Sequence, residues 1–168
     1  MTYNALKTQV SELETATGLG HEDRRQVAEA LSKATADTYR VFVMTQGVHW
    51  NVQGPLFYSV HKLTEDQYQD MFEAIDDLAE RVRAIGFPAP QSVTTLMGDP
   101  DLKEPDPAAP LHEQIEALAA ANEQLARSFR NGVRMAEEHD DVKTADLLTD
   151  RIGLHEENVW MLRATIAE

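Results

Sequence analysis

The chain contains no cysteine, and this absence excludes several classes of site at once. Disulfide bonds, thiolate zinc sites and cysteine nucleophiles are impossible, so any metal ion must be bound by His, Asp or Glu. Such ligands suit iron, manganese and zinc. Long apolar runs are also missing: no stretch approaches the ~18 residues that cross a bilayer, and the first ten residues do not resemble a signal peptide. We therefore expect a soluble, cytoplasmic protein without a membrane partner.

Basic residues are scarce, since 15 Lys and Arg stand against 29 Asp and Glu, for a formal net charge of -14. This excess of negative charge repels a nucleic-acid backbone unless a local basic patch overrides it. Arg24 and Arg25 are adjacent, and further arginines follow at 127, 130 and 134, but acidic residues surround both groups. The charge fits cations as ligands or, as the more common explanation of such a composition, simple solubility.

Apolar residues make up 42% of the 168 positions, enough for the core of a single domain over residues 1–168. Strand-like alternation is absent, and four long segments show a helical period. They run from about 23 to 50, from about 59 to 85, from about 111 to 138, and over the stripe from Val142 to Ile166. Gly54 with Pro55, Gly86, and the acidic turn EEHDD separate them.

The connections between these segments determine the expected topology. Residues 1–20 form an N-terminal tail, and the first and third links between helices are short. The middle connection, from about 87 to 110, carries most of the prolines and has room for a short helix over 92–97. Short outer links with one long central crossover predict an all-α protein, the ferritin-like form of the four-helix bundle.

The second predicted helix has an acidic face within a turn and a half, formed by Glu73, Asp76, Asp77 and Glu80. Arg81 follows Asp77 by four residues and Arg83 follows Glu80 by three, so surface ion pairs account for part of this face. Asp76 has only Glu73, Phe72, Ala79 and Glu80 as helical neighbours, and a divalent cation would relieve its repulsion. A solvated acidic face is the commoner alternative.

His49 and His61 lie on either side of the first link and could be ordinary core side chains or metal ligands. Fifteen residues separate His61 from Asp76, about 22 Å along a helix at ~1.5 Å per residue, so the two cannot share an ion within one chain. The Glu-x-x-His pairs of an intrachain di-iron bundle are also missing, because no histidine has a glutamate three positions before it. If these residues share a site, a second, antiparallel copy of the helix must supply the carboxylates, as a two-fold axis does.

A family resemblance follows from these residues. The pattern H-W-N-V-x-G-x-x-F at 49–57, then His61, then D-x-x-A-E-R at 76–81 resembles the signature of the Dps family, the starvation-induced mini-ferritins. It extends to the helix lengths, the crossover and the TADLL stretch of the last helix. The resemblance implies metal ligands from His49 and His61 of one subunit, Glu65 as a further carboxylate, and Asp76 and Glu80 of the two-fold partner.

The family implies a function as well. Its members bind Fe(II) at this site, oxidise it with hydrogen peroxide or O2, and store the ferric product inside a homododecamer, which protects against oxidative damage. Zinc is a competitor for such a site. Trp50 matches a family tryptophan thought to supply or quench an electron, and packing at an interface is an equal alternative. Asp141 and Asp146 match positions that line a three-fold pore for iron, where a solvated acidic turn is the alternative.

We expect the remaining histidines to have structural roles. His155 lies on the apolar stripe of the last helix and is expected to be a satisfied core residue. His21, His112 and His139 fall near helix ends, where they face solvent or cap.

Two other functions compete with the ferroxidase. A DNA-compacting Dps protein with secondary iron oxidation would need a lysine-rich tail, but the first twenty residues hold one basic side chain, Lys7, so we expect weak or absent DNA binding. A helical interaction module with structural His and Asp residues would be a small species without iron uptake.

Overall fold

The computed structural model describes residues 10–97 and 102–167, and every regular element in these two ranges is a helix. In chain order these are α1 (His21–Asn51), α2 (Phe57–Ala84), the single turn α3 (Val93–Leu96), α4 (Leu111–Glu138) and α5 (Val142–Thr165). The expected all-α fold is confirmed. The predicted helices agree with these bounds to within about two residues, and α3 lies inside the predicted short helix.

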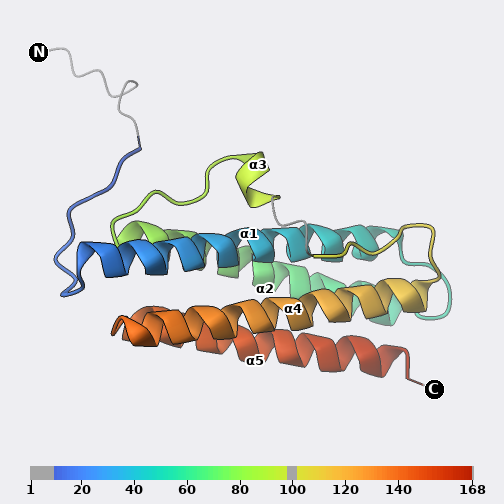
Figure 1. Cartoon of the computed structure of the whole chain (residues 1–168). Coiled ribbons are helices and arrows are strands. Elements are labelled where there is room, and N and C mark those ends of the chain that lie inside the picture. Colours follow the sequence, from blue (N-terminus) through green and yellow to red (C-terminus); the bar gives the residue numbers. More distant parts are fainter. Residues whose placement is uncertain (1–9, 98–101, 168) are drawn as a thin grey trace, which may run out of the picture.

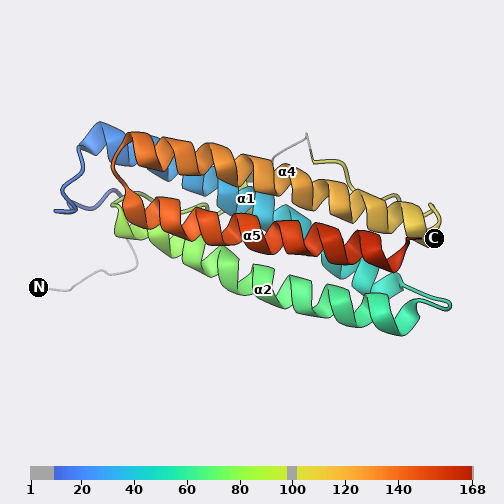
Figure 2. The same cartoon turned by 90° about the horizontal axis from the view of Figure 1, so that it is seen from below.

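The four long helices form two antiparallel hairpins, α1 with α2 and α4 with α5, packed into one bundle (Figures 1 and 2). Helix α1 also contacts α4, and α2 contacts α5. The described parts of the crossover from α2 to α4, on either side of residues 98–101, lie along the outside of α1, where α3 contacts α1 (Figure 1). In the described part of the chain, no helix combines the length and apolar character needed to span a membrane.

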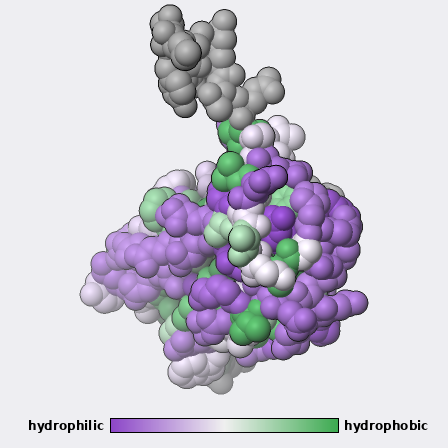
Figure 3. All heavy atoms as spheres, turned by 90° about the vertical axis from the view of Figure 1, so that its left-hand side faces the viewer, coloured by the Kyte–Doolittle hydropathy of each residue, from purple (hydrophilic) through white to green (hydrophobic). Residues whose placement is uncertain are grey.

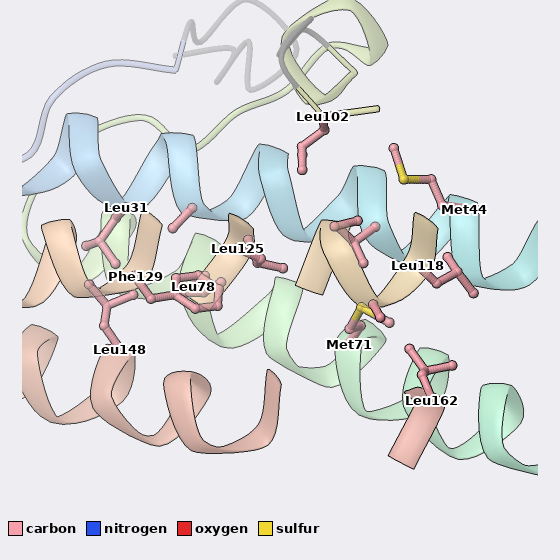
Figure 4. Packing of buried hydrophobic residues seen from close by; sticks show 14 of the residues in the cluster. Leu31, Met44, Met71, Leu78, Leu102, Leu118, Leu125, Phe129, Leu148 and Leu162 are labelled. Carbon is pink, nitrogen blue, oxygen red and sulfur yellow. The ribbon is translucent and has the colours of Figure 1, made fainter. Parts of the chain in front are cut away.

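The core runs the length of the bundle and takes large side chains from all four helices (Figure 4). Leu31, Met71, Phe129 and Leu148 are among its fully buried members. On α2 the buried positions recur every three or four residues, which places them on one stripe. Burying each large apolar side chain contributes roughly 1.5–3 kcal/mol, so this stripe holds α2 against the rest of the bundle.

The segment before α1 is fixed to the C-terminal end of α2. The backbone N–H of Leu13 donates to the carbonyl of Gly86 over 2.8 Å. Arg24 donates to the carbonyl of Ile85 over 2.8 Å and to Thr15 Oγ1 over 2.9 Å. Gly86 has a φ of 102°, which ends α2 in the left-handed region that favours glycine. Within the predicted N-terminal tail, residues 10–20 are therefore partly anchored, and residues 1–9 lie outside the described ranges.

Candidate metal centre

The short link between α1 and α2 brings His49 and His61 together. His49 lies in the last turn of α1 and is only 7% exposed, while His61 lies in the second turn of α2 and is half-buried. Their imidazole rings stack with centroids 3.8 Å apart and an angle of 17° between the planes. The sequence alone left their proximity open, and the fold places them side by side.

Two reciprocal hydrogen bonds show that Nδ1 carries a proton in both rings. Nδ1 of His49 lies 2.9 Å from the carbonyl oxygen of His61, and Nδ1 of His61 lies 3.0 Å from the carbonyl oxygen of His49. A carbonyl oxygen only accepts, so each Nδ1 must carry the proton. In the neutral ring each Nε2 is then left with a lone pair, which is the state in which histidine binds a metal ion.

Three further side chains surround the pair: Phe57, the last residue of the H-W-N-V-x-G-x-x-F pattern, and Thr64 and Tyr68, which lie outside it. Thr64 Oγ1 lies 3.4 Å from Nδ1 of His49. The ring of Tyr68 meets His49 edge-on with centroids 5.1 Å apart, and Phe57 stacks on His61 at 5.1 Å. Thr64 and Tyr68 follow His61 by three and seven residues. This spacing places all three on one face of a helix, and it could have indicated from the sequence that they lie together.

Glu65 lies one turn after His61 and is half-buried. Its carboxylate accepts a hydrogen bond from Lys62 Nζ over 2.5 Å. This bond and the charge of Lys62 lower the pKa of Glu65 below its usual value, with partial burial opposing them. Lys62 therefore keeps Glu65 negatively charged, one helical turn from His61.

Trp50 is 68% exposed, although it directly follows His49. Two aromatic side chains of the following segment, Phe57 and Tyr58, are also exposed. Large aromatic rings left in water together are typical of a surface that another molecule covers. The exposed position fits the interface alternative for Trp50 and does not test an electron-transfer role.

Asp76 and Glu80 are exposed on α2, apart from the histidines. Nowhere in residues 10–97 and 102–167 do three or more His, Asp or Glu side chains meet in a way that would hold an ion. The histidine pair of one chain thus offers two nitrogen ligands. Asp76 and Glu80 do not complete the ligand set of the same chain, because they lie too far along α2 from His61.

The prediction that surface ion pairs with Arg81 and Arg83 account for part of the acidic face is wrong. Arg81 turns away from Asp77 and donates from Nη2 to Asp141 Oδ1 over 2.7 Å and from Nε to Thr144 Oγ1 over 3.0 Å. Arg83 donates to the carbonyl of Phe87 over 2.9 Å. Within the described residues, the four carboxylates Glu73, Asp76, Asp77 and Glu80 form no ion pair, because Arg81 binds to α5 and Arg83 binds to the backbone just after α2.

Comparison with known proteins places this geometry in a family. The model of the ferritin-like domain matches residues 28–168. The chain is 31% identical over 140 residues to a protein of Bacillus anthracis named DNA protection during starvation protein 2, covering 83% of this chain and 96% of the relative. The chain belongs to the Dps family. A low temperature-induced protein of Nostoc, itself uncharacterized, is 40% identical over 151 residues, covering 89% of this chain and 84% of that protein.

Solved structures of Dps proteins agree with this assignment. The Dps protein of Bacillus brevis superposes with a TM-score of 0.83 at 28% identity, covering 89% of this chain and all of the other. DpsC from Streptomyces coelicolor gives a TM-score of 0.88 at 22% identity, covering 94% and 93%, a likeness of fold. The Dps protein of Vibrio cholerae, at 26% identity, a TM-score of 0.81 and coverage of 92% and 100%, is described as a member of a broad superfamily of ferritin-like diiron-carboxylate proteins.

For this Dps-family chain, the two predicted pore residues have different surroundings. Asp141 is buried and caps α5: Oδ1 accepts from the Thr144 N–H over 3.0 Å, and Oδ2 accepts from Thr144 Oγ1 over 2.7 Å. Because Arg81 is a further partner, both carboxylate oxygens of Asp141 are hydrogen-bonded. The buried position of Asp141 argues against a role in lining a pore. Asp146 is exposed and pairs with Lys143 over 2.9 Å. This end of the bundle is mostly hydrophilic (Figure 3).

The other histidines lie in structural positions. His155 is fully buried, and its Nδ1 donates to Asn122 Oδ1 over 2.7 Å, as expected for a satisfied core residue. His139 ends α4 and contacts Asp23 at 3.0 Å. His21 and His112 are exposed near the first residues of their helices.

Proposed function

We propose that the protein is a ferroxidase and iron store that binds Fe(II) between two copies of the chain. The observation that carries this proposal is the pair of reciprocal hydrogen bonds, which leaves the Nε2 lone pairs of His49 and His61 available for a metal ion. Membership in the Dps family and the diiron-carboxylate description of a related structure support iron as that metal.

The second copy supplies the carboxylates. An antiparallel α2 related by a two-fold axis would bring its Asp76 and Glu80 to the histidines of the first chain, and the symmetry generates two equal sites per dimer. The absence of ion pairs at these carboxylates in the described residues leaves both free to bind iron. Exposed Trp50 would lie in the same interface, next in sequence to the ligand His49, where it would pack and supply or quench an electron. Glu65 adds a further carboxylate.

The ligand set suits the reaction. Neutral imidazoles bind Fe(II), and carboxylates favour the Fe(III) product. Two Fe(II) ions each give one electron to a peroxide molecule, whose O–O bond breaks to yield two water molecules after uptake of two protons. Pairing the electrons in this way avoids the hydroxyl radical. We propose that the ferric product is stored in a hollow dodecamer, that O2 is a slower oxidant, and that zinc competes for the site.

A simple experiment separates this function from that of a helical interaction module. The purified protein is given Fe(II) in air or with peroxide and is then run on size-exclusion chromatography. The expected result is an amber particle near twelve times the 18.8 kDa of one chain. A colourless monomer or dimer contradicts the proposal.

A complementation experiment tests whether the site is shared between chains. One variant lacks the histidines (His49→Ala with His61→Ala), and the other lacks the carboxylates (Asp76→Ala with Glu80→Ala). Each homodimer has no complete site and should lose most peroxide-dependent iron oxidation. When the two variants are co-assembled in equal amounts, half of the dimers contain one chain of each variant. Each mixed dimer has one intact site out of two, so about a quarter of the wild-type activity should return. A mixture that stays inactive while it assembles contradicts a shared site.

The matched control removes the other two carboxylates of the same face. Glu73 and Asp77 have the same spacing of four residues on α2 and are also exposed. Glu73→Ala with Asp77→Ala should assemble and oxidise iron at close to the wild-type rate. Equal losses in both double variants would mean that general negative charge, rather than ligation by Asp76 and Glu80, drives the reaction.

A further inference from the structure

In the described part of the chain, the amide of Gln67 is a core side chain whose polar atoms are both unpaired. Gln67 lies on the buried stripe of α2, between Thr64 and Met71, and is 3% exposed. Both its Nε2 and its Oε1 are shielded from solvent without a hydrogen-bond partner among the described residues. Burying an amide in this way removes both polar groups from water without replacing their hydrogen bonds, so native proteins nearly always provide a partner.

Contacts between α2 and α5 locate Gln67 within the bundle. The two helices are antiparallel: Arg81 pairs with Asp141, and Asp70 pairs with Arg151 ten residues further along α5. Moving one turn from Asp70 towards the start of α2 and one turn from Arg151 towards the end of α5 places Gln67 opposite His155. Gln67 therefore belongs to a polar layer in the middle of the bundle core.

Hydrogen bonds fix the donors and acceptors of this layer. Asn122 Nδ2 donates to the carbonyl of Leu118 over 2.9 Å, so its Oδ1 is the acceptor for the proton on His155 Nδ1. Nε2 of His155 is then an acceptor, 3.5 Å from Nη2 of Arg151. Arg151 uses Nη1 and Nη2 to hold the Asp70 carboxylate at 3.0 and 2.5 Å. Its Nε is buried and unpaired, like the amide of Gln67.

The unpaired donors and acceptors of Gln67 and Arg151 determine which kind of ligand can bind between them. Gln67 Oε1 needs a donor, while Gln67 Nε2 and Arg151 Nε need an acceptor. A metal ion could bind Oε1 but is repelled by the guanidinium of Arg151, and the carboxylate of Asp70, one turn away on α2, is already paired with that cation. An anion could accept from the two N–H groups but leaves Oε1 unpaired. A water molecule can donate and accept at the same time.

We infer that the seam between α2 and α5 holds a buried water site, in which ordered water bridges the amide of Gln67 and Nε of Arg151. Two or three polar partners are what a buried water needs in order to stay ordered. The site occupies the bundle interior, where a Glu-x-x-His set would place an intrachain di-iron centre, and its ligands suit water in place of metal. It is separate from the His49 and His61 pair.

The test is a crystal structure of the assembled protein at a resolution that shows ordered solvent, with a second crystal soaked in Mn(II). The expected result is a water peak within hydrogen-bonding distance of Gln67 and Arg151 Nε, without anomalous signal from manganese. A direct hydrogen bond from the Gln67 amide to His155 or Asn158, a dry contact, or a manganese peak at this place overturns the inference.

Two substitutions of nearly equal volume test whether Gln67 holds the water. Gln67→Met removes both polar atoms, so the water keeps one partner and its peak should disappear. Gln67→Glu retains an acceptor beside the Arg151 cation, so the peak should remain. A peak of full strength in the methionine variant overturns the assignment, as does its loss in the glutamate variant.

Discussion

The chemistry of each histidine depends on which ring nitrogen carries the proton. At His49 and His61 a backbone carbonyl accepts from Nδ1, which directs the Nε2 lone pair away from the link between the helices. At His155 the same kind of bond goes to Asn122, and the ring is enclosed by the core. One residue type therefore presents a free Nε2 lone pair for the proposed metal site at one place and a neutral core group at another.

His155 should make stability depend on pH. Burial lowers its pKa from 6.5 to about 3, and the cation of Arg151 adds to this, with Asp70 opposing it. Below pH 6.5 the unfolded chain takes up a proton that the folded chain does not bind until about pH 3. The free energy of unfolding should therefore fall with pH in this window, by up to about 1.4 kcal/mol per pH unit from this group.

The measurement is urea unfolding of the wild type and of His155→Gln at several values from about pH 6 to pH 4. Glutamine has no charge to gain, so the variant should lose less stability over this range, whatever its stability at neutral pH. Parallel pH profiles would show that His155 is not buried as a neutral ring.

The turn between α4 and α5 depends on a cap. Asp141 binds the first turn of α5 and also Arg81 of α2, so Asp141→Ala should lower the free energy of unfolding by about 1–2 kcal/mol for the cap and by more for the unpaired arginine. Asp141→Asn keeps an acceptor oxygen and should lie between wild type and the alanine variant. Thermal or urea unfolding gives the order.

Asp146→Ala is the control for this prediction. Its carboxylate pairs with Lys143 at the surface, so the free energy of unfolding should change by less than about 1 kcal/mol. If Asp146 draws iron into the particle, the variant should still show a lower initial rate of iron oxidation. A stability loss equal to that of Asp141→Ala would contradict the distinction drawn between the two residues.

The anchoring of the N-terminal segment depends on Gly86. A Cβ at this position would lie 2.6 Å from the Leu13 carbonyl oxygen, in addition to the cost of about 1–2 kcal/mol for a side chain at positive φ. Gly86→Ala should therefore release residues 11–15 from the end of α2. Limited proteolysis with a glutamate-specific protease, which can cut after Glu12 and Glu14, measures the release.

Gly54→Ala is the matched control. Gly54 also has a positive φ, 88°, but a Cβ there meets nothing within 4 Å. This variant should lose stability through the strained backbone conformation, but residues 11–15 should stay attached to the end of α2. Equal cleavage of the two variants would mean that general destabilisation, and not the contact with Leu13, exposes the chain.

At the scale of the whole molecule, charge governs which partners can approach. A dodecamer of chains with a net charge of -14 would carry 12 × -14, or -168, before iron enters. Few cations would be available to replace the counterions of DNA, so we expect little or no binding at moderate salt. A gel-shift assay without divalent metal tests this expectation, with added Mg²⁺ as the comparison. Retarded DNA in the metal-free lanes would favour the DNA-compacting alternative.

The sequence by itself determined the helices, their order and the long crossover, because hydrophobic period, Gly and Pro act locally along the chain. It also determined that His61 and Asp76 cannot share an ion within one chain, since the rise per residue of a helix is fixed. For the candidate site it named the residues, yet it could not assign a proton to either ring of the histidine pair.

Only the tertiary structure decided which groups meet. Arg81 contacts Asp141 in place of Asp77, and His155 hydrogen-bonds to Asn122, through contacts between residues more than thirty positions apart. Such pairings depend on the register between packed helices, which no local pattern encodes. The carboxylate of Asp141 shows the consequence: its acidic neighbours in the sequence indicate a solvated turn, but the packing of α2 against α5 makes it a buried cap.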